Sequence, residues 1–161
     1  MHIRTAEMSD LDAVTAVEAA CFPPSEAATR EEFEQRLLRY PNHFWLMFDD
    51  DKLIAFADGF VTDEPDLTDE MYARAGMHDE NGAWQMIFGL NTVPECRRRG
   101  HAGEIMRRII RDAKEQGRKG VVLTCKKHLV PYYARFGFAD EGKTAKSVHG
   151  NAEWNQMRLA F

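Results

Sequence analysis

Three stretches of the chain have apolar residues at the three- or four-residue spacing of a helix. The first, over about residues 10–20, places Leu11, Val14, Val17 and Glu18 on one face. The second begins after Thr29 and has the spacing of a capping box in residues 29–32. The third covers residues 100–116 and has an apolar stripe along its length. Three amphipathic helices are therefore expected.

Shorter runs of apolar and β-branched residues predict the strands. They cover residues 2–5, 43–48, 52–62, 83–93, 121–124, 138–142 and 152–160. An acidic turn over 49–51 joins two of them into a hairpin, and Gly89 interrupts the fourth at an expected bulge. Short helices are expected within 64–80 and over about 129–135. This order of elements predicts one α/β domain over residues 1–161, with a mixed sheet of six to seven strands and helices on both faces.

Charge is distributed unevenly along the chain. The net charge of −5 argues against a nucleic-acid partner. Residues 97–119 nevertheless contain nine basic and three acidic residues, against 12 basic and 23 acidic residues elsewhere. Such a local excess suits one anionic ligand.

Other features of the composition bear on location and metals. The first ten residues have no basic region followed by an apolar run, so no signal peptide is expected. No apolar stretch approaches the roughly 18 residues that span a bilayer. A cytoplasmic protein without a membrane segment is expected. Cys21, Cys96 and Cys125 are too widely spaced for a zinc site, so they are interpreted as reduced thiols and no metal is expected.

The turn over residues 97–103 joins a strand to the third helix. The first turn of a helix has unpaired N–H groups and a partial positive charge, which together can bind a diphosphate. Gly100, Ala102 and Gly103 would let the backbone approach such a group closely, and the arginines at 97–99 would add charge. A solvated basic surface turn is the alternative. The GXXG loop of RNA-binding KH domains fits less well, because that loop joins two helices.

Two motifs resemble the GNAT acetyltransferase superfamily. Residues 90–102 resemble its acetyl-CoA signature, a strand ending L-x-V-x-P followed by [Q/R]-x-x-G-x-[G/A], with Thr92 in place of the usual valine. Residues 129–138 resemble its closing Y-x-[K/R]-x-G-F block. The resemblance implies a GNAT-type domain in which the fourth and fifth main strands splay apart. The residues it assigns to acetyl-CoA are Leu90, Asn91, Thr92, Arg97, Arg98, Arg99, Gly100, His101, Ala102, Gly103 and Tyr133.

A narrower resemblance concerns the acceptor. Residues 124–133 are similar to the serotonin (arylalkylamine) N-acetyltransferase branch, as are the prolines near residue 23 and the helical insertion around 66–77. This implies a small primary amine as acceptor, with arylalkylamines one class of it, and a monomer or homodimer. Phe22, Pro23 and Phe88 are the expected acceptor pocket. A polyamine or a protein amino group is the alternative acceptor, and a catalytically silent CoA-binding module is the alternative function.

The resemblance also implies roles in direct attack by the amine within a ternary complex. Backbone N–H groups at Leu90 and Thr92 would polarise the thioester, as an oxyanion site does. Tyr133 would protonate the departing thiolate, whereas a packing role is the alternative for this residue and the expectation for Tyr132.

The base is where the sequence departs from the arylalkylamine enzymes. Their two histidines correspond to Met86 and Phe88, which cannot accept a proton, and Lys126 lies near the position of the superfamily's common asparagine. An alkylamine has a pKa of about 10.4, so its proton must be removed or the amine must arrive neutral. The open candidates for the base are Glu26, Asp58, His149 and a chain of water molecules. A thiol nucleophile formed by Cys125 and His128 is a further, weaker alternative.

Overall fold

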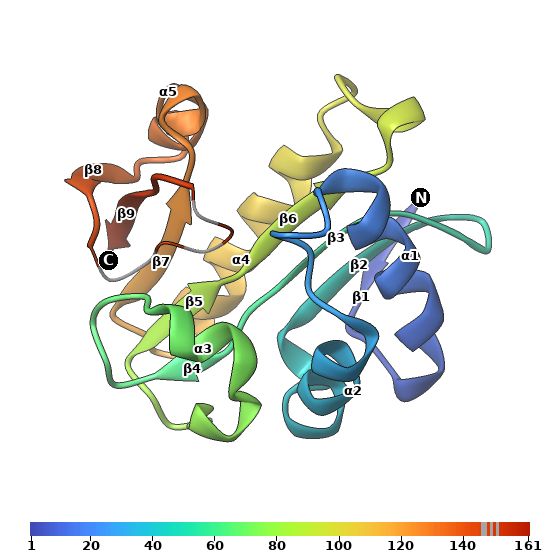
Figure 1. Cartoon of the computed structure of the whole chain (residues 1–161), viewed down its shortest axis with the longest axis horizontal. Coiled ribbons are helices and arrows are strands. Elements are labelled where there is room, and N and C mark those ends of the chain that lie inside the picture. Colours follow the sequence, from blue (N-terminus) through green and yellow to red (C-terminus); the bar gives the residue numbers. More distant parts are fainter. Residues whose placement is uncertain (146–147, 149, 151) are drawn as a thin grey trace.

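The computed structural model describes residues 1–145, 148, 150 and 152–161. Two sheets adjoin in this part of the chain (Figure 1). The strands of the first sheet, in spatial order, are β1 (His2–Arg4), β2 (Phe44–Asp49), β3 (Lys52–Asp58) and β6 (Gly89–Thr92). Those of the second are β4 (Val61–Thr62), β5 (Trp84–Ile87), β7 (Gly120–Cys125), β9 (Asn155–Ala160) and β8 (Ala139–Lys143).

Helices cover both faces of this layer. α1 (Leu11–Cys21) contacts β3, β6 and α2 (Arg30–Arg39), whereas α4 (His101–Glu115) contacts β2, β3, β6 and β7 from the opposite face (Figure 1). The capping box predicted for α2 is present, because the side chains of Thr29 and Glu32 each accept the backbone N–H of the other. The mixed α/β domain with helices on both faces is confirmed.

The two sheets meet at Phe88, the only residue between β5 and β6. β5 pairs in parallel with β7, from Trp84 opposite Gly120 to Ile87 opposite Leu123. Beyond Phe88 the chain continues as β6 and pairs instead with β3. The strand predicted over 83–93 therefore belongs to both sheets, and it separates from β7 along β6. This is the splay that the resemblance implies, although the predicted single sheet is divided in two.

Other elements differ from the sequence-based expectation in their bounds. The strand predicted over 52–62 is divided into β3 and β4, and Gly59 lies between them. A Cβ on Gly59 would lie 1.8 Å from the carbonyl oxygen of Met86, so only glycine allows the two segments to approach this closely. The short helices are α3 (Asp69–Ala73) and α5 (Val130–Ala134). The described part of the chain holds no helix with the length and apolar character that crossing a membrane requires.

Candidate active site

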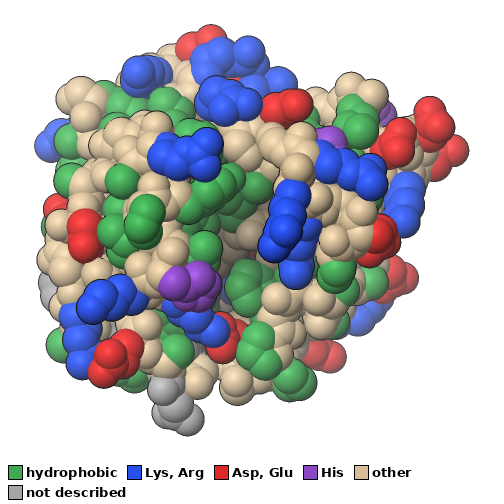
Figure 2. Space-filling view, turned by 90° about the horizontal axis from the view of Figure 1, so that it is seen from above, with side chains coloured by type: hydrophobic (Ala, Val, Ile, Leu, Met, Phe, Trp, Pro, Cys, Tyr) green, Lys and Arg blue, Asp and Glu red, His purple; other side chains and the backbone are tan. Residues whose placement is uncertain are grey.

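A cavity of about 1370 Å³ opens where β6 and β7 separate. Its wall comes from the end of α1, the loop before α2, β6, the N-terminus of α4, the end of β7, and α5. Figure 2 looks onto this end of the molecule and shows a hollow with hydrophobic side chains inside and Lys and Arg side chains beside it. Pockets for one drug-sized ligand measure roughly 300–1,000 Å³, so this cavity has room for two reactants.

Most of the residues predicted for the site meet in this wall. They are Phe22, Pro23, Phe88, Leu90, Asn91, Thr92, Arg97, Arg98, Gly100, His101, Ala102, Gly103 and Tyr133. Arg99 is exposed and does not line the cavity. Arg107 does line it and was not predicted, although Gly103 and Arg107 are four residues apart and so share a helix face.

The N-terminus of α4 presents free backbone donors to the cavity. Gly100 is the N-cap residue and has φ +83°, a left-handed conformation that favours glycine, and no side chain caps the helix. The first amide that bonds within the turn is that of Glu104, which donates to the carbonyl of Gly100. The amides of residues 101–103 thus have no partner within the helix.

His101 gives a second reason to place a polar ligand here. Its side chain is buried at 6% exposure in the cavity wall, and neither ring nitrogen has a hydrogen-bond partner among the described residues. Buried polar groups are seldom left unpaired. The open amides of α4 and this unpaired imidazole together suit an anionic ligand that also forms hydrogen bonds.

The backbone of β6 exposes donors on its open side. The amide of Val93 donates to the carbonyl of Ile54 on β3 at 2.9 Å, and alternation along an antiparallel strand then turns Leu90 and Thr92 away from β3. Consistent with this, the carbonyl of Thr92 accepts the Sγ–H of Cys21 at 3.2 Å and the Nε–H of Arg97 at 3.1 Å.

A bulge determines which amides of this segment point toward β3. Before the bulge, the amides of Met86 and Phe88 donate to the carbonyls of Phe60 and Asp58, so the even-numbered amides point to that side. After the bulge, the odd-numbered amides, such as that of Val93, point toward β3. The predicted bulge at Gly89 is thus present, and it includes Phe88.

Tyr133 lines the cavity from α5 and is half-buried. Its ring contacts Phe138 edge-on, with the ring centroids 6.1 Å apart. Burial raises the pKa of Tyr133 above that of an ordinary phenol, which keeps the hydroxyl protonated, as a proton donor requires. Tyr132, expected only to pack, also lines the cavity, and its ring packs edge-on against Phe136 at 5.4 Å.

Comparison with known proteins identifies the fold and the family. Residues 11–138 match the model of the Acetyltransferase (GNAT) family. The chain belongs to this family. The GNATL loading domain of CurA from Lyngbya majuscula is similar in structure, with a TM-score of 0.85, 15% identity, and coverage of 99% of this chain and 96% of that one.

Two further structures show how varied the relatives of this GNAT protein are. The GphF GNAT-like decarboxylase in complex with isobutyryl-CoA has a TM-score of 0.80 and 20% identity, and 99% of each chain is covered. The ribosomal-protein-S18-alanine N-acetyltransferase of Escherichia coli has a TM-score of 0.74 and 16% identity, with 99% of this chain and 92% of that one covered. At these identities the likeness shows the fold alone, and the family makes the protein an acyltransferase.

Glu18 is a further residue of this acyltransferase that the sequence analysis did not assign to the site. It projects from α1 into the cavity wall and is 6% exposed. Its Oε1 accepts the Nδ2–H of Asn91, and its Oε2 accepts the backbone N–H of Ala28, both at 2.9 Å. Burial and the neighbouring charge of Asp58 raise the pKa of Glu18 to about 7, against these hydrogen bonds. The available signal was an acidic residue on the inner face of an amphipathic helix.

The bases considered from the sequence lie in different places. Glu26 lines the cavity and is paired with Lys126 at 3.0 Å. Asp58 is 1% exposed, is ion-paired with Arg36 and does not line the cavity, so it cannot reach an acceptor. His149 lies outside the described residues. Met86 is fully buried.

The thiol-nucleophile alternative does not fit the structure of the enzyme. Cys125 and His128 both line the cavity, but the Sγ–H of Cys125 points to the sulfur of Met157 at 3.6 Å. Burial and the charge of Asp140 raise the pKa of the Cys125 thiol to about 11. A nucleophilic cysteine needs the opposite shift.

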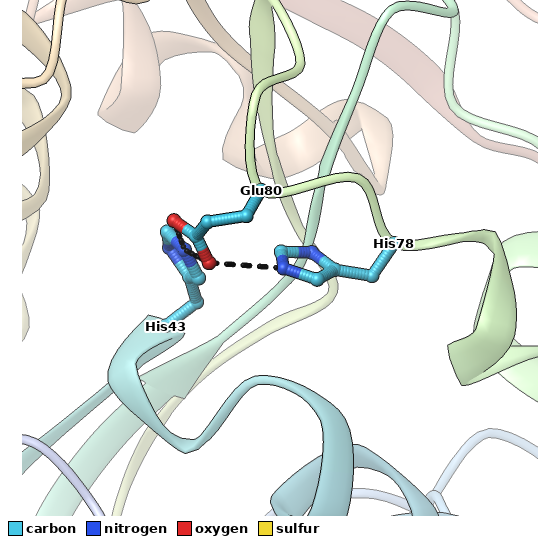
Figure 3. A group of neighbouring side chains, drawn as sticks. All are labelled: His43, His78 and Glu80. Carbon is cyan, nitrogen blue, oxygen red and sulfur yellow. Dashed lines mark hydrogen bonds and ion pairs between the residues drawn. The ribbon is translucent and has the colours of Figure 1, made fainter.

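One group of side chains outside the cavity has the spacing of metal ligands. Within the described residues, His43, His78 and Glu80 each place a ligand atom within 4.8 Å of the others (Figure 3). Hydrogen bonds account for this arrangement, however. The Nδ1 of His78 accepts the backbone N–H of Val61 at 3.0 Å, so its Nε2 carries the proton and donates it to Glu80. That nitrogen has no lone pair left for a metal.

Proposed function

We propose that the protein transfers an acetyl group from acetyl-CoA to the primary amine of a small acceptor, by direct attack within a ternary complex. One relationship carries the proposal. β6 with its open amides, Tyr133 and the N-terminus of α4 all line the same cavity. A thioester held by its diphosphate at α4 would therefore reach the groups that its carbonyl and its sulfur need.

Each group has a task that suits its chemistry. The amides of Leu90 and Thr92 donate to the carbonyl oxygen as negative charge develops on it. The amine nitrogen forms a bond to the carbonyl carbon, and the carbon–sulfur bond breaks. Tyr133, protonated at neutral pH, gives its proton to the departing sulfur.

The acceptor side of the cavity suits a cation with an apolar body. Three carboxylates line it, from Glu18, Glu26 and Glu32. Aromatic rings join them in the wall, from Phe22, Tyr72, Phe88 and Trp154. An ammonium group beside an aromatic or aliphatic chain would find both partners there, which is the basis for including arylalkylamines.

A panel of amines assayed for release of free CoA tests the function. Arylalkylamines, polyamines and peptides with free α-amino groups form its three arms, and calorimetry measures acetyl-CoA binding separately. Turnover of small amines supports the proposal. Turnover of peptides alone would replace the acceptor with a protein amino group, and binding without any turnover would indicate a silent CoA-binding module.

Variants at the two neighbouring tyrosines test the mechanism. Tyr133→Phe should lower kcat about 100-fold, because general acid catalysis contributes roughly that much or more, and should leave acetyl-CoA affinity unchanged. Tyr132→Phe removes the adjacent phenol and should retain most of the turnover. Equal effects of the two changes would contradict the assignment of Tyr133.

A further inference from the structure

We propose that Glu18 is the general base of this reaction and takes the proton of the acceptor ammonium. This rests on the proposed amine acetyl transfer. Glu18 would take the role of the two histidines of the arylalkylamine enzymes, whose positions are occupied here by Met86 and Phe88.

The carboxylate lies beside the proposed oxyanion site. Glu18 and Cys21 are three residues apart on α1 and so share a face, and the thiol of Cys21 contacts the carbonyl of Thr92 on β6. A Cβ built on Gly89 would lie 3.5 Å from Oε1 of Glu18. The carboxylate is thus packed against Gly89 of the bulge. The next residue in the sequence is Leu90, whose amide faces the cavity.

The carboxylate is oriented but retains free acceptor capacity. Asn91 and Ala28 each donate one hydrogen bond, one to each oxygen. A carboxylate oxygen has two lone pairs, so each oxygen can accept one further N–H. The Oδ1 of Asn91 is buried and has no hydrogen-bond partner among the described residues.

The proton balance follows from these positions. The ammonium gives one proton to Glu18 and becomes a neutral nucleophile, and Glu18 later releases this proton to solvent. The nitrogen then attacks, the carbon–nitrogen bond forms and the carbon–sulfur bond breaks. Tyr133 protonates the sulfur. The nitrogen loses a second proton when it becomes an amide nitrogen. This proton passes through solvent in the cavity to Tyr133 and restores its hydroxyl.

The surrounding charges suit a base at neutral pH. Asp58 on β3 disfavours the ionised form of Glu18, whereas Arg36 on α2 favours it. The hydrogen-bond donors on β6 and on the loop before α2 also favour the ionised form. Cys21 is the other titratable group nearby. With a pKa of about 7, Glu18 is partly ionised where an enzyme works, which is the best condition for proton transfer.

A structural role for Glu18, holding the loop at Ala28, is the competing explanation. Glu18→Gln separates the two. Glutamine can accept from Ala28 through its oxygen and donate to the free Oδ1 of Asn91 once that amide turns over, so the loop stays held. It cannot accept a proton.

The test compares pH profiles of kcat/KM for an amine that the wild type acetylates. We expect Glu18→Gln to lower kcat/KM about 100-fold, to remove the acidic limb near pH 7, and to leave acetyl-CoA affinity unchanged. The loss should shrink for acceptors whose own pKa is below the assay pH. Glu31→Gln, at an exposed carboxylate outside the cavity, should keep the wild-type rate and profile.

A second variant tests the proposal should Glu18→Gln fail to fold. Asn91→Ala removes a donor to the ionised carboxylate, so it should move the acidic limb to higher pH rather than abolish it. An unchanged limb and rate in Glu18→Gln, or an unmoved limb in Asn91→Ala, would overturn this proposal alone. If no amine were acetylated while acetyl-CoA still bound, the proposed function would fail and this proposal with it.

Discussion

Arg36 and Asp58 form an ion pair with an N–O distance of 2.9 Å, and their side chains are only 2% and 1% exposed. The guanidinium also donates to the carbonyl of Tyr72 at 2.8 Å and lies over the ring of Phe88, 5.0 Å from its centroid. The pair thereby connects α2, β3 and the segment of α3 with the residue at which the two sheets meet. Arg36 itself lines the cavity, so the pair holds part of the cavity wall in place.

Removing one charge of this pair should destabilise the protein strongly. Asp58→Ala leaves the Arg36 guanidinium buried without its counter-ion, and such changes reduce the free energy of unfolding by about 3–5 kcal/mol. Urea denaturation followed by circular dichroism measures this. The double variant Arg36→Met with Asp58→Leu, which removes both charges, should recover most of the loss. A single variant as stable as the wild type would mean that water reaches the pair.

Local sequence signals accounted for most of the fold. The capping box at Thr29, the apolar stripe of α4 and the glycine at the bulge each act within a few residues, so pattern alone located them. The division into two sheets was not visible in the same way. It depends on the close approach of Gly59 to Met86, which are distant in sequence and meet only in the folded chain.

The residues proposed to bind acetyl-CoA are easier to find in the sequence than those proposed for the acceptor, for a related reason. The proposed diphosphate site uses consecutive residues after β6, and these form a recognisable motif. The proposed acceptor side combines Glu18, Arg36, Tyr72 and Trp154 from four separate parts of the chain. In the sequence, Glu18 is one position on a helix, and its significance comes from Asn91, 73 residues further along.

The arginines of the turn before α4 should contribute unequally to acetyl-CoA binding. Arg98 lines the cavity, whereas Arg99 is exposed outside it. Arg98→Glu should weaken binding at least tenfold, equivalent to about 1.4 kcal/mol, because it replaces attraction for the diphosphate by repulsion. Arg99→Glu makes the same change in net charge and serves as the matched control.

Calorimetric titration at two salt concentrations distinguishes a contact from a general charge effect. A contact with the diphosphate should give a difference between the two variants that persists at high salt, since long-range interactions are screened there. Equal weakening by both variants, lost at high salt, would show that only the overall positive charge matters.

The cluster of His43, His78 and Glu80 should not bind zinc. Partial burial opposes ionisation of Glu80, but hydrogen bonds from His43 and Asn42 outweigh it and lower the pKa of this carboxyl to about 2. The carboxylate therefore already has its donors, and Nε2 of His78 carries a proton. Adding an equivalent of Zn²⁺ should leave the Tm unchanged. A rise in Tm that His78→Ala abolishes would show that the cluster rearranges into a metal site.

Stability should decrease with rising pH near neutrality because of Glu18. Its pKa is raised in the folded protein, so the folded state holds this proton more tightly than the unfolded chain does. The resulting stabilisation is fully present below about pH 4.5 and is lost as the pH rises through about 7. Its size is roughly 3 kcal/mol, at about 1.4 kcal/mol for each tenfold change in proton affinity. Urea denaturation from pH 5 to 8 should show this slope in the wild type and a flatter one in Glu18→Gln. The low pKa of Glu80 affects stability only under strongly acidic conditions, so it does not contribute to the slope between pH 5 and 8. Equal slopes in the wild type and in Glu18→Gln would mean that Glu18 ionises as freely as a carboxyl in water.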